Sequence, residues 1–295
     1  MPGDMDQRLR QLQLQTRYPV EHLLAGEYRS VFKGRGMDFD EIRPYEKGDD
    51  VRTIDWNVTA RTGKPHIKRY IEERELAVWF IVDTSASCRT GHGERTKWDA
   101  IHEICALLAL SAVKNNDRVG LILFSDQIEH INPPRKGRMN AMHMLSDLLK
   151  AEPQGKQTNL QPALDAFAHL SRRRSLAFII SDFLFDTGRD QLGSGSFRQD
   201  LIAVAVNDEQ EIAPPACGLT AVKDSETGET MLCDLNRARR DDYAGAFRTR
   251  RDALKKELET IGTDLIELST DSDCAEALTL FFRNRLRRTA DETGG

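Results

Sequence analysis

One short stretch of the chain sets a carboxylate and two hydroxyls at alternate positions after an apolar run. Asp83, Ser85 and Ser87 follow residues 76–82, LAVWFIV, which have the length and composition of a buried strand. An acid and two serines are an unusual way to end such a strand if only packing is required. The pattern indicates a binding site for a polar group or an ion.

Two other places in the sequence carry oxygen ligands in similar positions. Asp182 follows a second apolar run, residues 176–180, and Thr158 stands immediately before a predicted helix. In an open parallel sheet, ligands bind outside the carboxyl ends of the strands, so these side chains are expected to meet. Two carboxylates and three hydroxyls, without His or Cys, suit a hard divalent cation, Mg²⁺ above all and otherwise Mn²⁺ or Ca²⁺. The predicted metal ligands are Asp83, Ser85, Ser87, Thr158 and Asp182.

A plainer interpretation of the same residues involves no metal. Ser85, Ser87 and Thr158 would cap helices, and the two aspartates would be solvated loop acids.

The elements that must position these residues alternate between strand and helix after residue 75. Apolar runs of strand length occupy residues 76–82, 118–124, 176–180, 201–206 and 264–268, and helical patterns occupy 97–114, 138–150, 159–172, 241–262 and 273–286. Nearly continuous Val, Ile and Leu in alternating strands predict an α/β fold, a mainly parallel sheet with helices on both faces. Residues 127–131 are expected to form a short edge strand, and residues 208–235 a turn and a β-hairpin.

The N-terminal quarter has a different composition. Residues 4–15 suit a short amphipathic helix, whereas residues 18–75 are rich in Gly and charge and lack long periodic segments. This predicts a module of loops and short strands. We therefore divide the chain into an N-terminal segment, residues 1–75, and an α/β domain, residues 76–290.

The three-part oxygen set resembles the metal-ion-dependent adhesion site of von Willebrand factor A domains. The pattern Asp-x-Ser-x-Ser matches at Asp83, Ser85 and Ser87, the threonine loop at Thr158, and the strand-end aspartate at Asp182. The resemblance implies a von Willebrand A-like, Rossmann-like domain, whose ion is held by the serines, threonine and aspartates directly or through water. It also implies that an acidic residue of a partner protein completes the coordination. The family's last motif is usually Asp-Gly, whereas here Phe183 follows the aspartate.

A second motif precedes the first strand of the domain. Residues 43–61, RPYEKGDDVRTIDWNVTAR, mix acids, bases and aromatics, which is typical of ion pairs that fix a compact module. Asp49 or Asp50 with Arg52, and Asp55 with Arg61, are the candidate pairs. The segment is either a brace on the sheet or a partner-binding surface formed by Arg43, Tyr45, Asp49, Asp50, Arg52, Asp55, Trp56 and Arg61.

This second motif is similar to the signature of the bacterial domain-of-unknown-function family fifty-eight. The pattern R-x-Y-x-x-G-D-D-x-R-x-I-D-W-x-x-x-A-R is matched at every named position, and the C-terminal residues 248–285 are also similar. The resemblance covers residues 18–288, with one departure at Cys88, where the family commonly has methionine. It implies a MoxR-type AAA+ ATPase, or the client that it remodels, as the partner, and an adaptor or co-chaperone as the role.

The length, charge and composition of the chain limit the classes of protein to which it can belong. The chain has 295 residues, 30% of them charged, and a formal net charge of −5, which gives no long-range attraction to nucleic acid or to an anionic membrane. The sequence offers no membrane span, no secretory signal and no CxxC pair among its five cysteines, so we expect a reduced, cytoplasmic protein. There is also no GxxxxGK[ST] motif, so a partner would have to hydrolyse any ATP involved.

Two hypotheses of function follow. The first is a non-enzymatic, Mg²⁺-dependent protein-interaction module. The alternative is a metal-dependent phosphatase or hydrolase that uses Asp83 as its nucleophile. The alternative is weakened by Ser85, since the dehalogenase-like pattern requires a second aspartate at that position.

Overall fold

The apolar run before Asp83 forms the interior of the molecule. In the computed structural model it is strand β3 (Ala77–Asp83), which is buried at every position from Val78 onward. Successive side chains of a strand point to opposite faces, so Val78 and Phe80 belong to one hydrophobic core and Trp79 and Ile81 to another. A strand that is apolar on both faces must have a layer of helices on each side.

Six strands form the central sheet. In spatial order they are β10 (Asp264–Ser269), β7 (Asp200–Asn207), β6 (Ser175–Ser181), β3, β4 (Arg118–Phe124) and β5 (Ile128–Arg135). All neighbouring pairs are parallel except β4 and β5, which are antiparallel. The predicted α/β fold with a mainly parallel sheet is confirmed, as is the edge strand. The structure describes residues 2–32, 38–71, 75–155, 157–171, 175–185 and 200–293.

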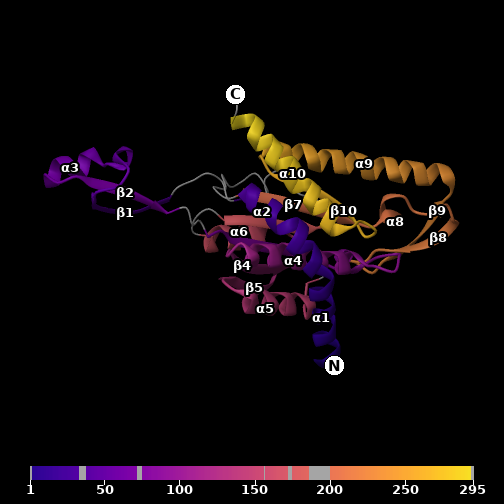
Figure 1. The fold of residues 1–295 in the computed structure, drawn as a ribbon. Coiled ribbons are helices and arrows are strands. Elements are labelled where there is room, and N and C mark those ends of the chain that lie inside the picture. Colours follow the sequence, from indigo (N-terminus) through magenta and orange to yellow (C-terminus); the bar gives the residue numbers. More distant parts are fainter. Residues whose placement is uncertain are drawn as a thin grey trace.

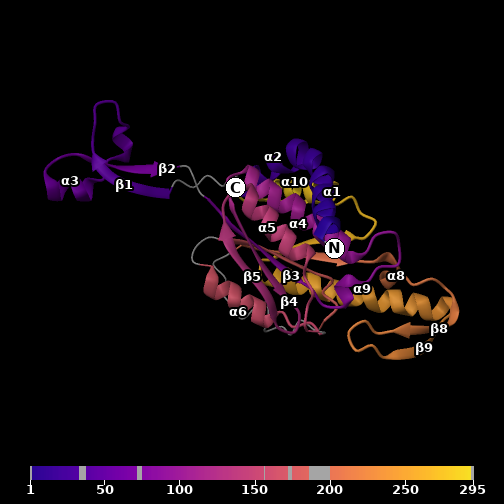
Figure 2. The same cartoon turned by 90° about the horizontal axis from the view of Figure 1, so that it is seen from below.

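Helices cover both faces of this sheet (Figures 1 and 2). One core contains residues of α1 (Pro2–Pro19), η1 (Val20–Leu24), α2 (Ala25–Phe32), α4 (Lys97–Lys114), α5 (Arg138–Leu149) and α10 (Cys274–Thr293). The core of the opposite face contains residues of α6 (Gln161–Leu170) and α9 (Arg237–Thr260). None of the described helices combines the length and the apolar composition that crossing a membrane would require.

Residues 18–32 correct one expectation. They were predicted to be irregular, but they continue the N-terminal helix as η1 and α2. Val20, Leu24 and Tyr28 are four residues apart and therefore line one helical face, which is buried against the sheet domain. The hydroxyl of Tyr28 donates a 3.1 Å hydrogen bond to Asp117 in front of β4. These residues thus belong to the core of the domain that follows.

The second motif forms a small module of its own. Strands β1 (Asp38–Pro44) and β2 (His66–Ile71) pair antiparallel, and between them lie η2 (Val51–Thr53) and α3 (Trp56–Thr62). In both views the module stands away from the six-stranded sheet (Figures 1 and 2). A second insertion outside the central sheet follows β7. There α8 (Glu209–Ile212) leads to the predicted hairpin of β8 (Gly218–Lys223) and β9 (Thr230–Leu235).

Candidate functional site

Two adjacent strand ends meet at the carboxyl edge of the sheet. Asp83 is the last residue of β3, and Ser181 is the last residue of the neighbouring β6. The hydroxyl of Ser181 donates a 2.6 Å hydrogen bond to Oδ2 of Asp83. Ser181 was not among the predicted site residues, although its position directly before Asp182 was the available signal.

The loop after β3 brings its hydroxyls together beside the carboxylate. The backbone N–H of Ser85 donates to Oδ1 of Asp83 at 2.9 Å, and the hydroxyl oxygens of Ser85 and Ser87 lie 3.1 Å apart. Asp83 and Ser85 are fully buried, and Asp182 is only 4% exposed. The interpretation of the two aspartates as solvated loop acids is therefore wrong. Burial is also the main reason why the pKa of Asp83 is raised to about 6.

A buried lysine neutralises part of this acidic cluster. Lys97, the first residue of α4, has no exposed surface, and its ammonium lies 2.9 Å from Oδ2 of Asp182 and 2.7 Å from Oε2 of Glu211 on α8. Burial alone would lower the pKa of Lys97, but the two carboxylates outweigh it and raise the pKa above its ordinary value. A lysine in the first turn is opposed by the helix dipole, and this anomaly was the sequence signal for its role.

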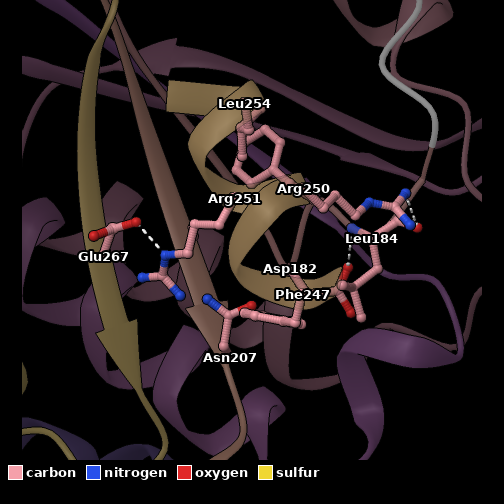
Figure 3. Close-up of a pocket in the computed structure, with 10 residues that line it drawn as sticks. Asp182, Leu184, Asn207, Phe247, Arg250, Arg251, Leu254 and Glu267 are labelled. Carbon is pink, nitrogen blue, oxygen red and sulfur yellow. Dashed lines mark hydrogen bonds and ion pairs between the residues drawn. The ribbon is translucent and has the colours of Figure 1, made fainter. Parts of the chain in front are cut away.

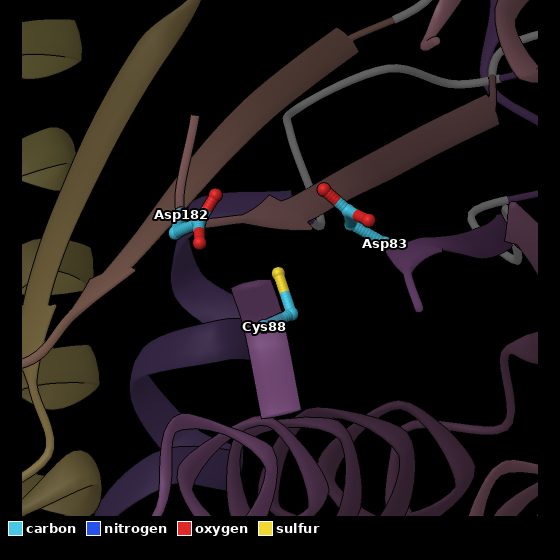
Figure 4. Close-up of side chains that lie close together, drawn as sticks. All are labelled: Asp83, Cys88 and Asp182. Atoms are coloured by element: carbon cyan, nitrogen blue, oxygen red, sulfur yellow. The ribbon is translucent and has the colours of Figure 1, made fainter. Parts of the chain in front are cut away.

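Cys88 lies between the two aspartates. Its sulfur and one carboxylate oxygen each of Asp83 and Asp182 lie within 4.8 Å of one another, and it points into the space between them (Figure 4). Burial, followed by the two nearby carboxylates, raises the pKa of the thiol well above its ordinary value. The sulfur is thus a protonated thiol, which is a poor metal ligand compared with a thiolate.

Thr158 is positioned by a separate set of contacts. Glu129 on β5 accepts hydrogen bonds from the backbone N–H groups of Gln154 and Gly155, at 3.1 and 2.8 Å, and so fixes the loop before α6. The hydroxyl of Thr158 donates a 3.0 Å hydrogen bond to Oε1 of Glu226, which lies in the turn between β8 and β9. Thr158 does not cap α6, whose N-cap is Leu160 and has no side-chain cap.

The residue after Asp182 has a glycine-like backbone. Phe183 adopts φ = 52°, in the left-handed region, although its side chain is buried in the core beneath α6 and α9. A bulky residue in this region is strained by about 1–3 kcal/mol and persists only where its surroundings impose it. The positive φ is one that glycine would adopt without strain, and the side chain of Phe183 anchors the loop in the core.

A shallow, partly open hollow adjoins Asp182 on the side of α9 (Figure 3). Phe247, Arg250 and Leu254 line it from the helix, and Arg251 forms an ion pair with Glu267 of β10 at its edge. Arg250 donates a hydrogen bond to the carbonyl of Leu184 and is otherwise exposed. The buried acidic cluster is thus bordered by an exposed guanidinium that is bonded to a neutral carbonyl.

The signature residues 43–61 lie in the projecting module, away from this cluster. Arg43 forms a bidentate pair with Asp49, with N–O distances of 2.7 and 2.9 Å. Asp55 accepts hydrogen bonds from the first turn of α3 and pairs with Lys68 at 3.1 Å. The pairs expected with Arg52 and Arg61 are wrong, because Asp50 instead caps η2 by accepting from the backbone N–H of residue 52.

The remaining signature side chains differ in exposure. Tyr45 is half-buried, and its N–H donates to the carbonyl of Pro65. Arg52 and Arg61 are exposed, and Trp56 is 71% exposed at the start of α3. The charged members of the motif thus brace the module internally, while its tryptophan faces solvent.

The donors at the sheet edge fit a hard divalent cation. A buried carboxylate and two hydroxyl oxygens converge at Asp83, Ser85 and Ser87, and these are the ligand types that Mg²⁺ accepts. Asp182 is paired with the buried ammonium of Lys97, whose positive charge would repel a cation at that carboxylate, so Asp182 suits an indirect role better than a direct one. A protonated Cys88 adds no competing soft ligand.

Comparison with known proteins gives a family but no established activity. The model of the family described as "Protein of unknown function DUF58" matches residues 41–253. An uncharacterised protein of Mycobacterium tuberculosis and one of Mycobacterium bovis are each 31% identical over 293 residues, covering 97% of this chain and 92% of the relative.

Several solved structures show a weaker similarity. The conserved hypothetical protein BatB of Bacteroides thetaiotaomicron is 12% identical with a TM-score of 0.47, covering 72% of this chain and 99% of that one. An aerotolerance-related membrane protein of Bacteroides fragilis is 15% identical with a TM-score of 0.46 and the same coverage. Similarity of this order says nothing about function.

Proposed function

Because the chain belongs to the DUF58 family of proteins of unknown function, we propose a role for its sheet-edge cluster. The protein is a non-enzymatic, Mg²⁺-dependent protein-interaction module with a von Willebrand A-like domain, and it acts in the cytoplasm. Its partner is a MoxR-type AAA+ ATPase or the client of that ATPase, for which it serves as adaptor. The observation that carries this proposal is the buried Asp83 carboxylate beside two adjoining serine hydroxyls.

The contacts of Asp83 favour an ion-binding role over a nucleophilic one. Both of its oxygens accept hydrogen bonds, from Ser181 and from the N–H of Ser85, and its side chain is fully buried. A nucleophile must be reached by its substrate, whereas this side chain has no exposed surface, and each of its oxygens keeps a further lone pair that a small cation can use. Its hydrogen bonds and burial instead suit a group that holds a cation in place.

Each residue of the cluster has a role in this proposal. Asp83, Ser85, Ser87 and Thr158 hold the ion, and Asp182 acts indirectly through Lys97. When bound, Mg²⁺ supplies a positive centre that accepts a carboxylate from the partner. The exposed Arg250 beside Asp182 favours an acidic partner residue electrostatically.

The projecting module contributes a second contact surface. The two ion pairs Arg43–Asp49 and Lys68–Asp55 each join residues of the module itself. Exposed apolar side chains remain at Trp56 and Val51, which are 71% and 61% exposed. Exposed tryptophan is the residue type most enriched at sites that dominate binding energy. We therefore assign partner binding to this face and bracing to Arg43, Asp49 and Asp55.

The test combines metal binding, partner binding and turnover. Mg²⁺ and Mn²⁺ are titrated by calorimetry into metal-stripped wild type, Asp83→Ala and a control, Asp165→Ala, which removes an exposed carboxylate on α6. We expect saturable binding by the wild type and the control and none by Asp83→Ala.

Binding to the MoxR-type ATPase encoded in the same genome is then measured with and without EDTA. We expect binding to require both the ion and Asp83. If Asp83→Ala and Asp165→Ala both bound Mg²⁺ as the wild type does, the ion site would be refuted. Mg²⁺-dependent hydrolysis of a generic phosphoester that disappears in Asp83→Asn would establish the enzymatic alternative instead.

A further inference from the structure

The hairpin that follows α8 reaches back to the candidate ion site. Thr158 and Glu226 are 68 residues apart in sequence, yet the threonine hydroxyl donates to Oε1 of Glu226 at 3.0 Å. Within the turn 224–229, Glu226 is the one residue that is partly buried, and the other five are exposed. The contact therefore directs a single carboxylate toward a predicted metal ligand.

The turn is built to present this carboxylate. Oδ1 of Asp224 accepts hydrogen bonds from the N–H groups of Glu226 and Thr227, at 2.8 and 3.1 Å. Gly228 has φ = 74°, a conformation that favours glycine, and its N–H donates to the carbonyl of Asp224. Glu226 thus projects from a turn that is ordered by its own local bonds.

The rest of the hairpin is loosely attached. Leu219 of β8 and Met231 and Leu232 of β9 are 71%, 65% and 73% exposed. Since burial of apolar surface is the main source of docking energy, strands that expose these side chains gain little of it. The hairpin can therefore leave the site at small cost.

We propose that Glu226 is a built-in acidic ligand, which occupies the position that the partner's carboxylate takes. The hairpin of β8 and β9 then occupies the binding site until a partner displaces it. An acidic residue of the partner must compete with Glu226 for the ion. This inference rests on the proposed ion site. It explains why a chain of this kind carries an exposed hairpin whose single partly buried turn residue is a glutamate facing Thr158.

Three variants separate an ion ligand from a structural anchor. Glu226→Gln keeps an oxygen that can accept from Thr158 but loses the charge, whereas Glu226→Ala loses both. Glu229→Gln removes the same charge from the exposed side of the same turn and is the control. Hydrogen exchange of the peptide covering residues 224–229 is followed in metal-free and Mg²⁺-loaded protein, beside calorimetry of Mg²⁺ binding.

We expect Mg²⁺ to slow exchange of this peptide in the wild type and in Glu229→Gln but not in Glu226→Gln. The Mg²⁺ affinity of Glu226→Gln should fall by roughly 10–100-fold, the range seen when a group that supports a metal is removed. In metal-free protein, Glu226→Ala should exchange faster than Glu226→Gln.

Wild-type protein that binds Mg²⁺ without any change in the exchange of this peptide would overturn the inference and leave the ion site intact. Absence of Mg²⁺ binding, equal in wild type and Asp83→Ala, would instead refute the ion site and the inference together. The two failures are therefore distinguishable.

Discussion

Two lysine–aspartate pairs of nearly equal length lie in very different surroundings. Lys97 and Asp182 are 2.9 Å apart at the sheet edge, where both side chains are almost fully buried. Lys68 and Asp55 are 3.1 Å apart in the projecting module, where the lysine is 39% exposed. Inside the domain neither charge can be satisfied by water, whereas in the module water reaches the ammonium of Lys68.

This difference indicates what each region is built to do. At the sheet edge, Asp182 and Glu211 share one buried ammonium and Asp83 lies close to Asp182, so the charge balance there is sensitive to any added or removed ion. In the module, ion pairs only stiffen a small β-structure and leave Trp56 in solvent. Under the proposed function, the first region binds the ion and the second contacts the partner protein.

The largest effect is expected from Lys97→Met. Removal of the ammonium leaves Asp182 and Glu211 buried without a counter-charge, which typically destabilises a protein by about 3–5 kcal/mol. Chemical denaturation of metal-free protein measures this loss. Mg²⁺ should restore part of it, because a divalent ion can balance the same carboxylates.

Lys68→Met is the matched control and should change the denaturation midpoint little, because Lys68 is exposed to water and Asp55 keeps its two backbone hydrogen bonds. If Lys97→Met and the wild type had equal denaturation midpoints, the Lys97–Asp182 and Lys68–Asp55 pairs would contribute equally to stability. The proposed difference between the sheet edge and the module would then be wrong.

The next effect is a pH dependence that has opposite signs in the two regions. The folded-state pKa of Asp83 is raised to about 6, chiefly by burial, so its contribution to stability is fully present below its ordinary value and is lost as the pH rises through 6. Relative to Asp83→Asn, the metal-free wild type should lose roughly 3 kcal/mol of unfolding free energy between pH 4 and pH 7.

Asp49 in the module should behave in the opposite way. The side-chain hydrogen bond from Arg43 lowers its pKa, so its contribution is present above its ordinary value and is lost as the pH falls. Denaturation of Asp83→Asn between pH 4 and pH 7, and of Asp49→Asn below pH 4, measures the two contributions. The same sign for the two variants would contradict the assigned environments.

A smaller effect is expected from Gly155→Ala in the loop that carries Thr158. An added Cβ would lie 2.1 Å from Oγ of Ser125 and 2.9 Å from its Cβ, so the loop must shift. Such overpacking typically costs about 1–3 kcal/mol, and the displaced Thr158 should also weaken Mg²⁺ binding. Calorimetry and denaturation measure the two consequences separately.

Gly245→Ala on α9 is the control, because nothing lies within 4 Å of its added Cβ. It should stabilise the protein by up to about 1 kcal/mol without changing Mg²⁺ binding. If Gly155→Ala also left Mg²⁺ binding unchanged, Thr158 would not be a ligand.

The sheet and its strand ends could be predicted from the sequence because apolar periodicity records burial directly. The run 76–82 had to be an internal strand, and the placement of Asp83 at its end followed from that. The buried helical face formed by Val20, Leu24 and Tyr28 was not predicted, because charged residues between them obscure the helical spacing of the apolar residues.

The electrostatic partners could not be predicted in the same way. Lys97, Glu211 and Glu226 meet their partners across 85, 114 and 68 residues, and no local pattern records such contacts. The ion pairs of the module were missed for the same reason on a smaller scale, because the strand pairing that brings Lys68 to Asp55 is non-local. The spacing of apolar and polar residues along the chain predicts which side chains lie at the surface of a fold. It does not predict which charged side chains pair with one another.

The smallest effect on stability, and the sharpest test of the module, is expected from Trp56→Ala. The side chain is 71% exposed at the start of α3, so its loss should change the unfolding free energy by less than about 0.5 kcal/mol. If this face meets the partner, the same substitution should weaken binding to the ATPase by tenfold or more, the size of effect expected of a tryptophan at the centre of an interface. Mg²⁺ binding by the sheet domain should not change, because the module stands apart from the ion site (Figure 1). If Trp56→Ala bound the partner as the wild type does while Asp83→Ala did not, the module would have no role in partner binding. The sheet edge would then be the contact surface.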